Sequence, residues 1–319
     1  MLLAACSAIL NKRAIHSHWF YYWSTDLITT PLIFGEVLFD CFPDNREVLG
    51  GAPFNVAWNL QAFGMQPFFV SRVGDDRQGG QILAKMKAWS MNTSGLQVDP
   101  SHPTGRVRIE LTDGEPQFAI LPSQAYDNIT PPVRIDLNSV SFLYHGSLAL
   151  RNKRNRTTLA GLKRDYRCPV FLDVNLRKPW WSENIIRQLI EDATWLKLNE
   201  DELNALFPGN ENLEQRTRKI LMHYNLEAVF ITRGHKGAMA HTKKNHISSV
   251  QPRRNISIVD TVGAGDAFSS VLLLGLIYNW PLDTTLDRAQ DFASAVVGQR
   301  GATTKDKKFY HHFSNTWGL

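Results

Sequence analysis

Apolar segments of strand length alternate with segments of helical length along most of this chain. Short apolar runs typical of buried strands occur at 32–39, 67–73, 140–145, 169–174, 195–198 and 228–232. Stretches with helical character lie between them, at 54–63, 81–89, 156–166, 183–193 and 213–224. Strands separated by helices of this length indicate right-handed βαβ units around a parallel sheet. We therefore predict an α/β fold with a mostly parallel central sheet.

The alternation is interrupted once, by two neighbouring strand-like segments with no helix between them. Residues 106–111 and 117–121 flank Thr112-Asp113-Gly114-Glu115-Pro116, a turn sequence typical of a hairpin. Such a hairpin can leave the main sheet, so we expect it to form a separate flap.

Composition narrows the classes of partner. The formal net charge of +5 favours anionic ligands such as nucleotides without requiring nucleic acid. The basic side chains between Arg151 and Arg167 are the one candidate nucleic-acid patch, but we favour a solvated helix face as their explanation, since aromatic side chains for stacking are scarce there. No apolar run reaches the roughly 18 residues of a membrane span. Three widely separated cysteines without metal-site spacing indicate reduced thiols and a cytoplasmic protein. We expect no nucleic acid and no membrane among its partners.

The first 29 residues differ from the rest. They are rich in aromatic side chains without a clear period, and the first convincing strand begins only near Pro31. We treat residues 1–29 as an N-terminal extension and expect it to be poorly ordered. Residues 30–319 are then expected to form the folded domain.

The stretch Ile258-Val259-Asp260-Thr261-Val262-Gly263-Ala264-Gly265-Asp266-Ala267-Phe268 carries the clearest chemical signal. We expect a strand over 256–259, a tight Gly-Ala-Gly turn, and an almost wholly apolar helix over 267–277. Such a turn leaves backbone N–H groups at the positive end of the helix dipole, where an anion such as phosphate binds. Glycines at 263 and 265 allow the backbone to approach that anion closely.

Asp266 is unusual in a phosphate-binding turn, because a carboxylate repels a phosphate. The carboxylate is useful there if it accepts a proton from a nucleophile beside the phosphate, so the turn indicates phosphoryl transfer to a hydroxyl. A simple helix cap is the alternative interpretation. The chain has no P-loop motif, and Phe268 stands where a dinucleotide fingerprint needs its third glycine.

A second polar group lies near the N-terminal end. Asp40 follows the first apolar run, and Gly50-Gly51-Ala52-Pro53-Phe54-Asn55 opens the next helix. In an open parallel sheet, ligands bind outside the carboxyl ends of the strands. A carboxylate, backbone amides and a carboxamide suit a polyhydroxylated substrate, because each can bond to a sugar hydroxyl. A turn acid, a glycine turn and a helix-face asparagine would look the same.

The run from Asp260 to Asp266 resembles the second signature, D-T-x-G-A-G-D, of the PfkB/ribokinase family of sugar kinases. In that family the last aspartate is the catalytic base, and the amides of the Gly-Ala-Gly turn form the anion hole. The resemblance implies that Asp266 is the base and that Gly263, Ala264 and Gly265 hold the transferring phosphoryl group.

The first family signature contains G-G-x-x-x-N, and the sequence from Gly50 to Asn55 matches it. The family also has a sugar-binding aspartate at the end of its first strand, which corresponds to Asp40. The resemblance implies that Asp40, Gly51 and Asn55 bind the sugar.

Asp173-Val174-Asn175-Leu176-Arg177 resembles the D-x-N-x-R segment of fructokinase-like members. This likeness adds Asn175 and Arg177 to the implied sugar site. The segment from Gly35 to Pro43 is also most similar to the fructokinase branch.

Three further segments resemble the nucleotide side of the family's site. Residues 197–202 contain the motif N-x-x-E. In the family this motif takes part in binding magnesium and phosphate, which implies that role for Asn199 and Glu202. The alternative is that these residues cap a helix, because acids at a helix start are also typical of N-caps. Residues 232–237 match the nucleotide loop T-x-G-x-x-G and imply ATP contacts from Thr232, Gly234 and Gly237. Residues 299–302 resemble the adenine-pocket segment.

The resemblance covers about residues 32–305, so it leaves out the extension and a short tail. It implies a ribokinase-like three-layer α/β fold with a mostly parallel central sheet and a small β-sheet lid from about 41–50 and 103–122. The cofactors implied are ATP and Mg²⁺, with a monovalent cation such as K⁺ as a further candidate. A homodimer is a further candidate assembly, because exposed lid strands often pair in this family.

The implied reaction is ATP-dependent phosphorylation of a primary sugar hydroxyl, with fructose and fructose 6-phosphate as the expected substrate and product. Kinases for 2-keto-3-deoxygluconate, ribose or a nucleoside are alternatives within the same class. A catalytically idle homologue that only binds sugar or nucleotide is the alternative from another class.

Overall fold

The computed structural model describes residues 30–112, 115–132, 140–252 and 257–319. The N-terminal extension expected over 1–29 lies outside these residues. The strands of the main sheet are β1 (Thr30–Phe34), β4 (Phe68–Gly74), β5 (Leu96–Asp99), β8 (Val140–His145), β9 (Val170–Asp173), β10 (Trp195–Asn199), β11 (Ala228–Thr232), β12 (Ala238–Thr242) and β13 (Ile247–Val250).

Within the described residues, these nine strands have the order β13-β12-β11-β10-β9-β8-β1-β4-β5. The pairings from β5 to β11 are parallel, and β12 and β13 add an antiparallel edge. The predicted α/β fold with a mostly parallel sheet is confirmed. Because parallel strands share one direction, their carboxyl ends meet along one edge, where ligands bind in such folds.

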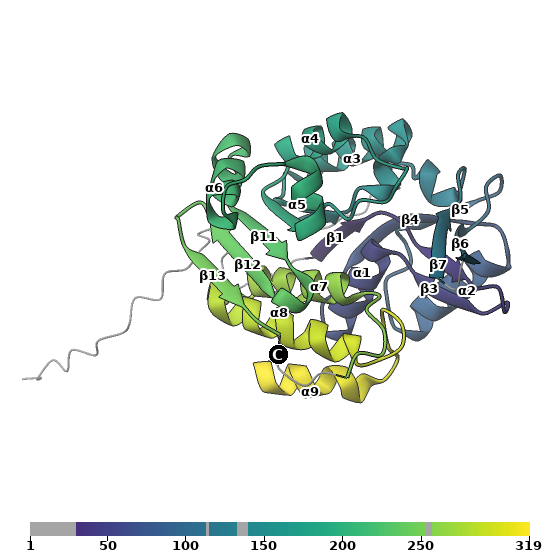
Figure 1. The fold of residues 1–319 in the computed structure, drawn as a ribbon. Helices are drawn as coiled ribbons and strands as arrows, with labels where there is room; N and C mark the ends of the chain where they lie inside the picture. Colours follow the sequence, from purple (N-terminus) through teal and green to yellow (C-terminus); the bar gives the residue numbers. More distant parts are fainter. Residues whose placement is uncertain (1–29, 113–114, 133–139, 253–256) are drawn as a thin grey trace, which may run out of the picture.

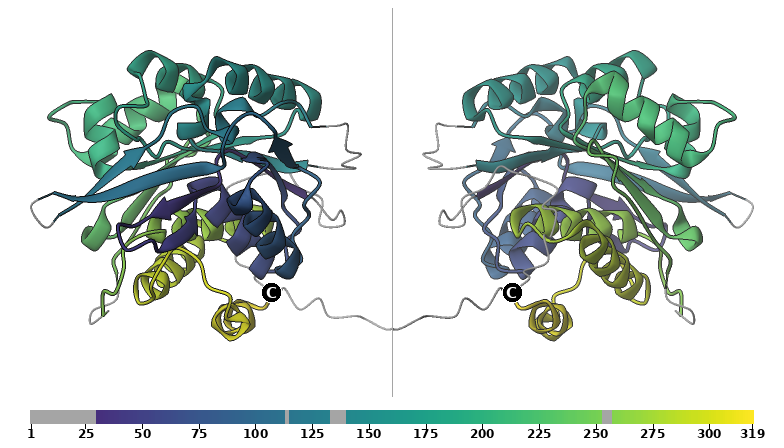
Figure 2. Two further views of the ribbon diagram at one scale, coloured as in Figure 1. Left: turned by 90° about the vertical axis from the view of Figure 1, so that its right-hand side faces the viewer. Right: turned by 90° about the vertical axis from the view of Figure 1, so that its left-hand side faces the viewer.

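Helices cover both faces of the sheet (Figures 1 and 2). Their bounds are α1 (Ala52–Ala62), α2 (Arg77–Ala88), α3 (Lys153–Tyr166), α4 (Glu183–Glu191), α5 (Glu200–Leu206), α6 (Leu213–Tyr224), α7 (Ala264–Ile277), α8 (Leu282–Val297) and α9 (Lys307–Trp317). One apolar core joins the sheet to α3–α6, and the other joins it to α1, α2, α7, α8 and α9.

The alternation of side chains along each strand produces these two cores. In β10, Leu196 and Leu198 pack toward α3–α6, whereas Trp195 packs on the side of α7. None of the helices in the described part of the chain is both long and apolar enough to cross a bilayer.

A second, smaller sheet has the order β3-β2-β6-β7 and consists of β2 (Leu38–Cys41), β3 (Glu47–Gly50), β6 (Gly105–Thr112) and β7 (Glu115–Ile120). Figure 1 shows it beside α2, and Arg77 of α2 donates to Glu47 of β3 at 2.8 Å. The β6–β7 hairpin therefore leaves the main sheet as predicted, and residues that follow Asp40 join it.

The prediction of one strand over 32–39 is wrong. The chain turns at Gly35, whose φ of +150° is open mainly to glycine, and a Cβ at this position would lie 2.4 Å from Cγ of Pro53. β1 consequently pairs with β4 and β8 in the main sheet, while β2 pairs with β3 and β6 in the small sheet. An apolar run shows that a segment is buried, but not that it stays in one sheet.

The prediction of a strand over 256–259 is also wrong for the described part, since residues 257–259 are irregular. The amides of Val259 and Asp260 bond instead to the carbonyl of Val297 at the end of α8. α7 begins at Ala264, three residues before the predicted start. The expected tail contains α9, which packs through Tyr310 and Phe313 against Phe292 of α8.

Candidate active site

The turn before α7 has the geometry of an anion-binding helix N-terminus. Gly263 adopts a left-handed conformation (φ 82°), and a Cβ there would lie 2.4 Å from Cα of Ala302. The carboxylate of Asp260 holds the turn, since it accepts the N–H of Val262 at 3.0 Å and that of Gly301 at 2.9 Å. The amide of Ala264 makes a long bond of 3.4 Å to the carbonyl of Thr261. The amides of Gly265 and Asp266, in the first turn, have no acceptor within the helix and can bind a phosphate.

Asp266 lies in the first turn of α7 and faces α1. Its Oδ2 accepts a hydrogen bond of 2.7 Å from Nδ2 of Asn55. Burial raises the pKa of Asp266 to about 6, although the bond from Asn55 and the positive charges of Lys197 and Arg177 lower it. A carboxylate with this pKa is ionised at neutral pH and can still accept a proton.

The small sheet and α1 bring the predicted sugar-binding positions to the same region. Asp40 is half-buried in β2, and burial raises its pKa to about 6. Its Oδ2 would lie 3.4 Å from a Cβ at Gly50. Gly51 precedes α1 with φ 109°, and a Cβ there would lie 2.7 Å from the carbonyl oxygen of Glu36. The turn therefore requires glycine at position 51.

The connection after β9 places a positive charge among these acids. Arg177 lowers the pKa of Asp40 and of Asp266, and it acts in the same direction on Glu36. Asn175 adopts φ 45°, and its carbonyl oxygen lies 3.5 Å from Oγ of Ser147. The structure thus brings Arg177 close to carboxylates from β2 and α7.

Glu36 was not assigned a role from the sequence. It lies between β1 and β2, is 2% exposed, and its Oε2 has no hydrogen-bond partner among the described residues. Burial raises its pKa to about 7, and the nearby charge of Asp266 also raises it. The sequence does contain a signal for Glu36, because it is the one charged residue in the apolar run 32–39.

Asn199 and Glu202 form a capping box at the start of α5. The N–H of Glu202 donates to Oδ1 of Asn199, and the N–H of Asn199 donates to Oε2 of Glu202, both at 2.8 Å. Oε1 of Glu202 accepts the N–H of Leu176 at 2.7 Å. The N-cap interpretation of these acids therefore describes their contacts within the protein.

The loop after β11 is a tight turn. Gly237 has φ 84°, and a Cβ there would lie 1.8 Å from the carbonyl oxygen of Val250, so this glycine is required by packing. The amide of Gly237 donates to the carbonyl of Gly234, so this amide is already used within the turn. Thr232 ends β11 opposite Asn199 of β10, so both lie at the carboxyl edge of the sheet.

No cluster of three or more potential metal-ligating His, Cys, Asp or Glu side chains occurs in the described ranges.

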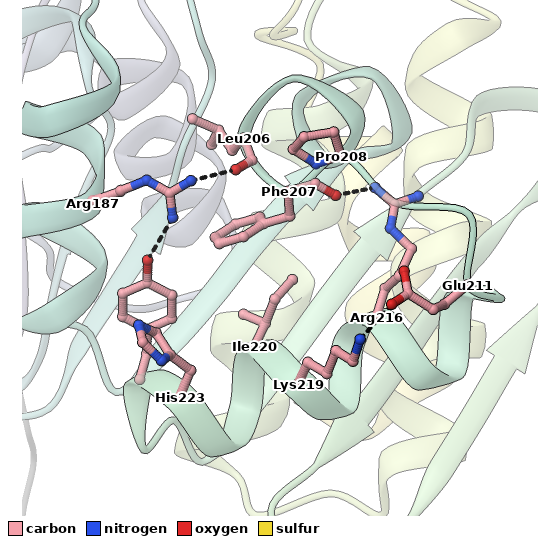
Figure 3. A pocket seen from close by; sticks show the side chains of 10 residues that line it. Arg187, Leu206, Phe207, Pro208, Glu211, Arg216, Lys219, Ile220 and His223 are labelled. Carbon is pink, nitrogen blue, oxygen red and sulfur yellow. Dashed lines mark hydrogen bonds and ion pairs between the residues drawn. The ribbon is translucent and has the colours of Figure 1, made fainter.

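A cavity of about 380 Å³ lies between α4, α5 and α6, away from these residues (Figure 3). Arg187 donates to the carbonyl of Leu206 and to the hydroxyl of Tyr224, and Arg216 donates to the carbonyl of Phe207. Both arginines cap the C-terminal end of α5. None of the predicted site residues lines this cavity.

Residues 26–308 match the family described as pfkB family carbohydrate kinase. The chain is 29% identical to a probable fructokinase-5 of Arabidopsis thaliana, over 78% of this chain and 84% of that protein. It is 27% identical to fructokinase-2 of Solanum lycopersicum, over 76% and 80%.

Two solved structures show the same fold. Fructokinase from Vibrio cholerae O395, in a form with fructose, ADP and calcium ion bound, gives a TM-score of 0.73 at 25% identity, over 89% of this chain and 98% of that one. Fructokinase from Xylella fastidiosa with bound ATP gives 0.80 at 19% identity, over 92% and 100%. The family match, the fold and the order of the motifs agree: this chain belongs to the pfkB family of carbohydrate kinases and is a phosphotransferase acting on a sugar hydroxyl.

Proposed function

We propose that this enzyme transfers the γ-phosphoryl group of ATP to the primary 6-hydroxyl of fructose, with Asp266 as the base. The observation that carries the proposal is the position of Asp266, which is held by Asn55 at 2.7 Å beside the first amides of α7. The base and the anion-binding amides therefore belong to one turn. A hydroxyl placed between them would lose its proton to the carboxylate while the amides stabilise the phosphoryl oxygens.

Charge favours a neutral sugar over a sugar acid. Arg177 faces the carboxyl groups of Asp40, Glu36 and Asp266, so acids outnumber the guanidinium. The carboxylate of 2-keto-3-deoxygluconate would be repelled by such a site, whereas the hydroxyls of fructose can donate to each acid. The fructokinase names of the relatives support the same choice.

We assign sugar binding to Asp40, Gly51, Asn55, Asn175 and Arg177. The small sheet is the proposed lid, because Asp40 belongs to β2 and would be brought over the sugar by that sheet. Closure would exclude water, which otherwise competes with the sugar as acceptor.

The nucleotide is proposed to lie along the carboxyl ends of β10 and β11, beside Asn199, Thr232 and Gly234. Gly234 has φ 53° and open space at its Cβ position, so its backbone can be approached closely. The V. cholerae fructokinase was crystallised with ADP and calcium, and a double mutant with ADP and potassium.

The position of Glu202 suits binding of Mg²⁺ through a water molecule. Each of its carboxylate oxygens accepts one backbone amide and keeps a second lone pair, which suits a magnesium ion that retains its waters. Mg²⁺ bound with ATP would neutralise charge on the phosphates. For K⁺ we propose only that it increases the rate of the reaction.

A panel of fructose, ribose, 2-keto-3-deoxygluconate and adenosine, each with ATP and Mg²⁺, tests the proposal by ADP formation. The expected result is the highest kcat/KM with fructose. A preference for the sugar acid would overturn the choice of substrate. If none of the compounds increased ADP formation, the protein would be an idle homologue.

A further inference from the structure

Two oppositely charged side chains that the proposed mechanism does not use lie behind the first turn of α7. Asp173 at the end of β9 and Lys197 in β10 are direct neighbours in the parallel pairing of these strands. Nζ of Lys197 bonds to both carboxylate oxygens of Asp173, at 3.0 and 2.9 Å. Each side chain is only 5% exposed, so the ion pair is withdrawn from solvent.

Hydrogen bonds connect the carboxylate of this pair to α7. Ser269 donates to Oδ2 of Asp173 at 2.6 Å, and the same hydroxyl oxygen lies 3.0 Å from the carbonyl oxygen of Gly265. Tyr144 of β8 donates to the same Oδ2 at 3.3 Å. Asp173 therefore links β8 and β10 to Ser269 of α7.

The ammonium lies directly behind the turn. A Cβ built on Gly265 would lie 3.7 Å from Nζ of Lys197, so a side chain at this position of the turn would be in contact with the ammonium. An ammonium has three donors, and Asp173 accepts two of them. In a site that excludes water, a fixed positive charge stabilises the transition state most strongly where negative charge develops during the reaction.

Stability alone does not account for the pair. Withdrawing two charges from water offsets most of their attraction, so a buried ion pair is weak support for a fold. The surrounding face of the sheet is apolar, with Phe171, Trp195 and Phe230 in the same core. Apolar side chains at 173 and 197 would suit that core at least as well.

We propose that Asp173 and Lys197 are positioning residues for phosphoryl transfer. Asp173 orients the first turn of α7 through Ser269, and Lys197 supplies a fixed positive charge behind the turn's amides. This inference rests on the proposed function, in which Asp266 accepts the proton of the sugar hydroxyl.

The two charges act on the base in opposite directions. Asp173 raises the pKa of Asp266 and Lys197 lowers it. The other ionisable groups that face Asp266 are Arg177 after β9, which lowers its pKa, together with Glu36 before β2 and Tyr144 of β8. Substitutions at 173 and 197 leave those three groups in place.

The test compares the pH dependence of kcat/KM for fructose in wild type, Lys197→Met, Asp173→Asn and the double variant. Lys197→Met leaves an unpaired carboxylate, so the acid limb should move up by about one pH unit. Asp173→Asn leaves an unpaired ammonium, so the limb should move down by about one unit. The double variant should return close to the wild-type midpoint, with kcat reduced on the order of tenfold or more.

Shifts of opposite sign separate a positioning role from a structural one. Folded variants that all lose activity equally, with one unchanged midpoint, would overturn the inference. If the single variants do not fold, Ser269→Ala keeps the ion pair and removes its link to α7. A lower kcat with unchanged fructose KM and midpoint is expected for that variant, and wild-type kcat would overturn the role of Asp173.

The same data show whether the proposed function itself fails. Wild type without fructose-dependent ADP formation, or Asp266→Asn with the wild-type acid limb, would reject Asp266 as the base. A normal wild-type limb that is lost in Asp266→Asn and unmoved in the pair variants would reject only the inference about Asp173 and Lys197.

Discussion

Nδ2 of Asn55 donates to Oδ2 of Asp266 at 2.7 Å, across 211 residues of sequence. The bond joins the first turns of α1 and α7, and so joins the two segments that resemble the family's signatures. Because the helices proposed to bind the sugar and the phosphoryl group share this contact, a change in either residue should affect the reaction more than the binding of either substrate alone.

Asp266→Asn is expected to retain ATP and fructose binding while kcat falls by roughly three powers of ten or more, because a carboxamide cannot accept the hydroxyl proton. Calorimetric titration and coupled ADP release measure the two properties. Asp201→Asn is the matched control, since Asp201 is an exposed acid in the first turn of α5. Near-normal turnover of Asp266→Asn would refute the assignment.

The pH profile of kcat/KM should show an acid limb near pH 6. Burial raises the pKa of Asp266 to about 6, and only the ionised form accepts a proton. Activity is therefore expected to be full above pH 7 and to fall as the pH drops through 6. An acid limb near pH 4 would show that the base is a solvated carboxylate elsewhere.

Glu36→Gln should stabilise the protein at pH 8.5 relative to wild type, and much less at pH 5. Burial raises the pKa of Glu36 from 4.5 to about 7, so between these values only the unfolded chain has released the proton, and wild-type stability falls as the pH rises from 4.5 to 7. The expected difference between the two pH values is about 3 kcal/mol in the free energy of unfolding. Urea unfolding of both proteins measures it, and an equal effect of the substitution at both pH values would contradict the buried, protonated state.

Gly263→Ala should destabilise the protein more than Gly64→Ala. Both glycines are left-handed, with φ 82° and 84°, but a Cβ at 263 overlaps Ala302 whereas nothing lies within 4 Å of one at 64. The common backbone strain costs about 1–2 kcal/mol, so the excess in Gly263→Ala measures the overlap. The Gly263→Ala variant should lose kinase activity, whereas the Gly64→Ala variant should keep it. Equal destabilisation by the two substitutions would show that the turn accommodates a methyl group.

Arg177→Met should raise the fructose KM by on the order of tenfold and move the acid limb to higher pH. The guanidinium lowers the pKa of Asp40 and of Asp266, so its removal favours their protonation. Steady-state kinetics over pH 5–9 provides the measurement. Arg154→Met, at an exposed position of α3, is the control for loss of a positive charge. A limb that stays in place would mean that Arg177 acts on the sugar alone.

Most elements of the fold could be predicted because burial on both faces leaves a continuous apolar signal in the sequence. α6 and β11 have the predicted bounds, 213–224 and 228–232. The run at 32–39 could not be divided by the same reasoning, because Pro53 lies against Gly35 only after the chain has folded. The helix at 307–317 was missed because its aromatic residues find their partners on α8.

The candidate site was predicted in part. Asp40, Asn55, Arg177 and Asp266 were named from short motifs, and the structure brings these charges and the carboxamide together. Glu36 and the Asp173–Lys197 pair were missed. A lysine in the run Trp-Leu-Lys-Leu was visible in the sequence, but its burial depends on the register of β9 and β10.

The sequence by itself determined most of the segments that become strands and helices, and the turn that carries an acid at the start of a helix. These properties depend on residue type and spacing over a few neighbouring positions. Only the tertiary structure decided how that acid is held and how strongly it binds a proton. Its pKa depends on burial and on charges from β9, β10 and the connection after β9, which lie far from residue 266 in the chain and meet it only when the sheet has formed.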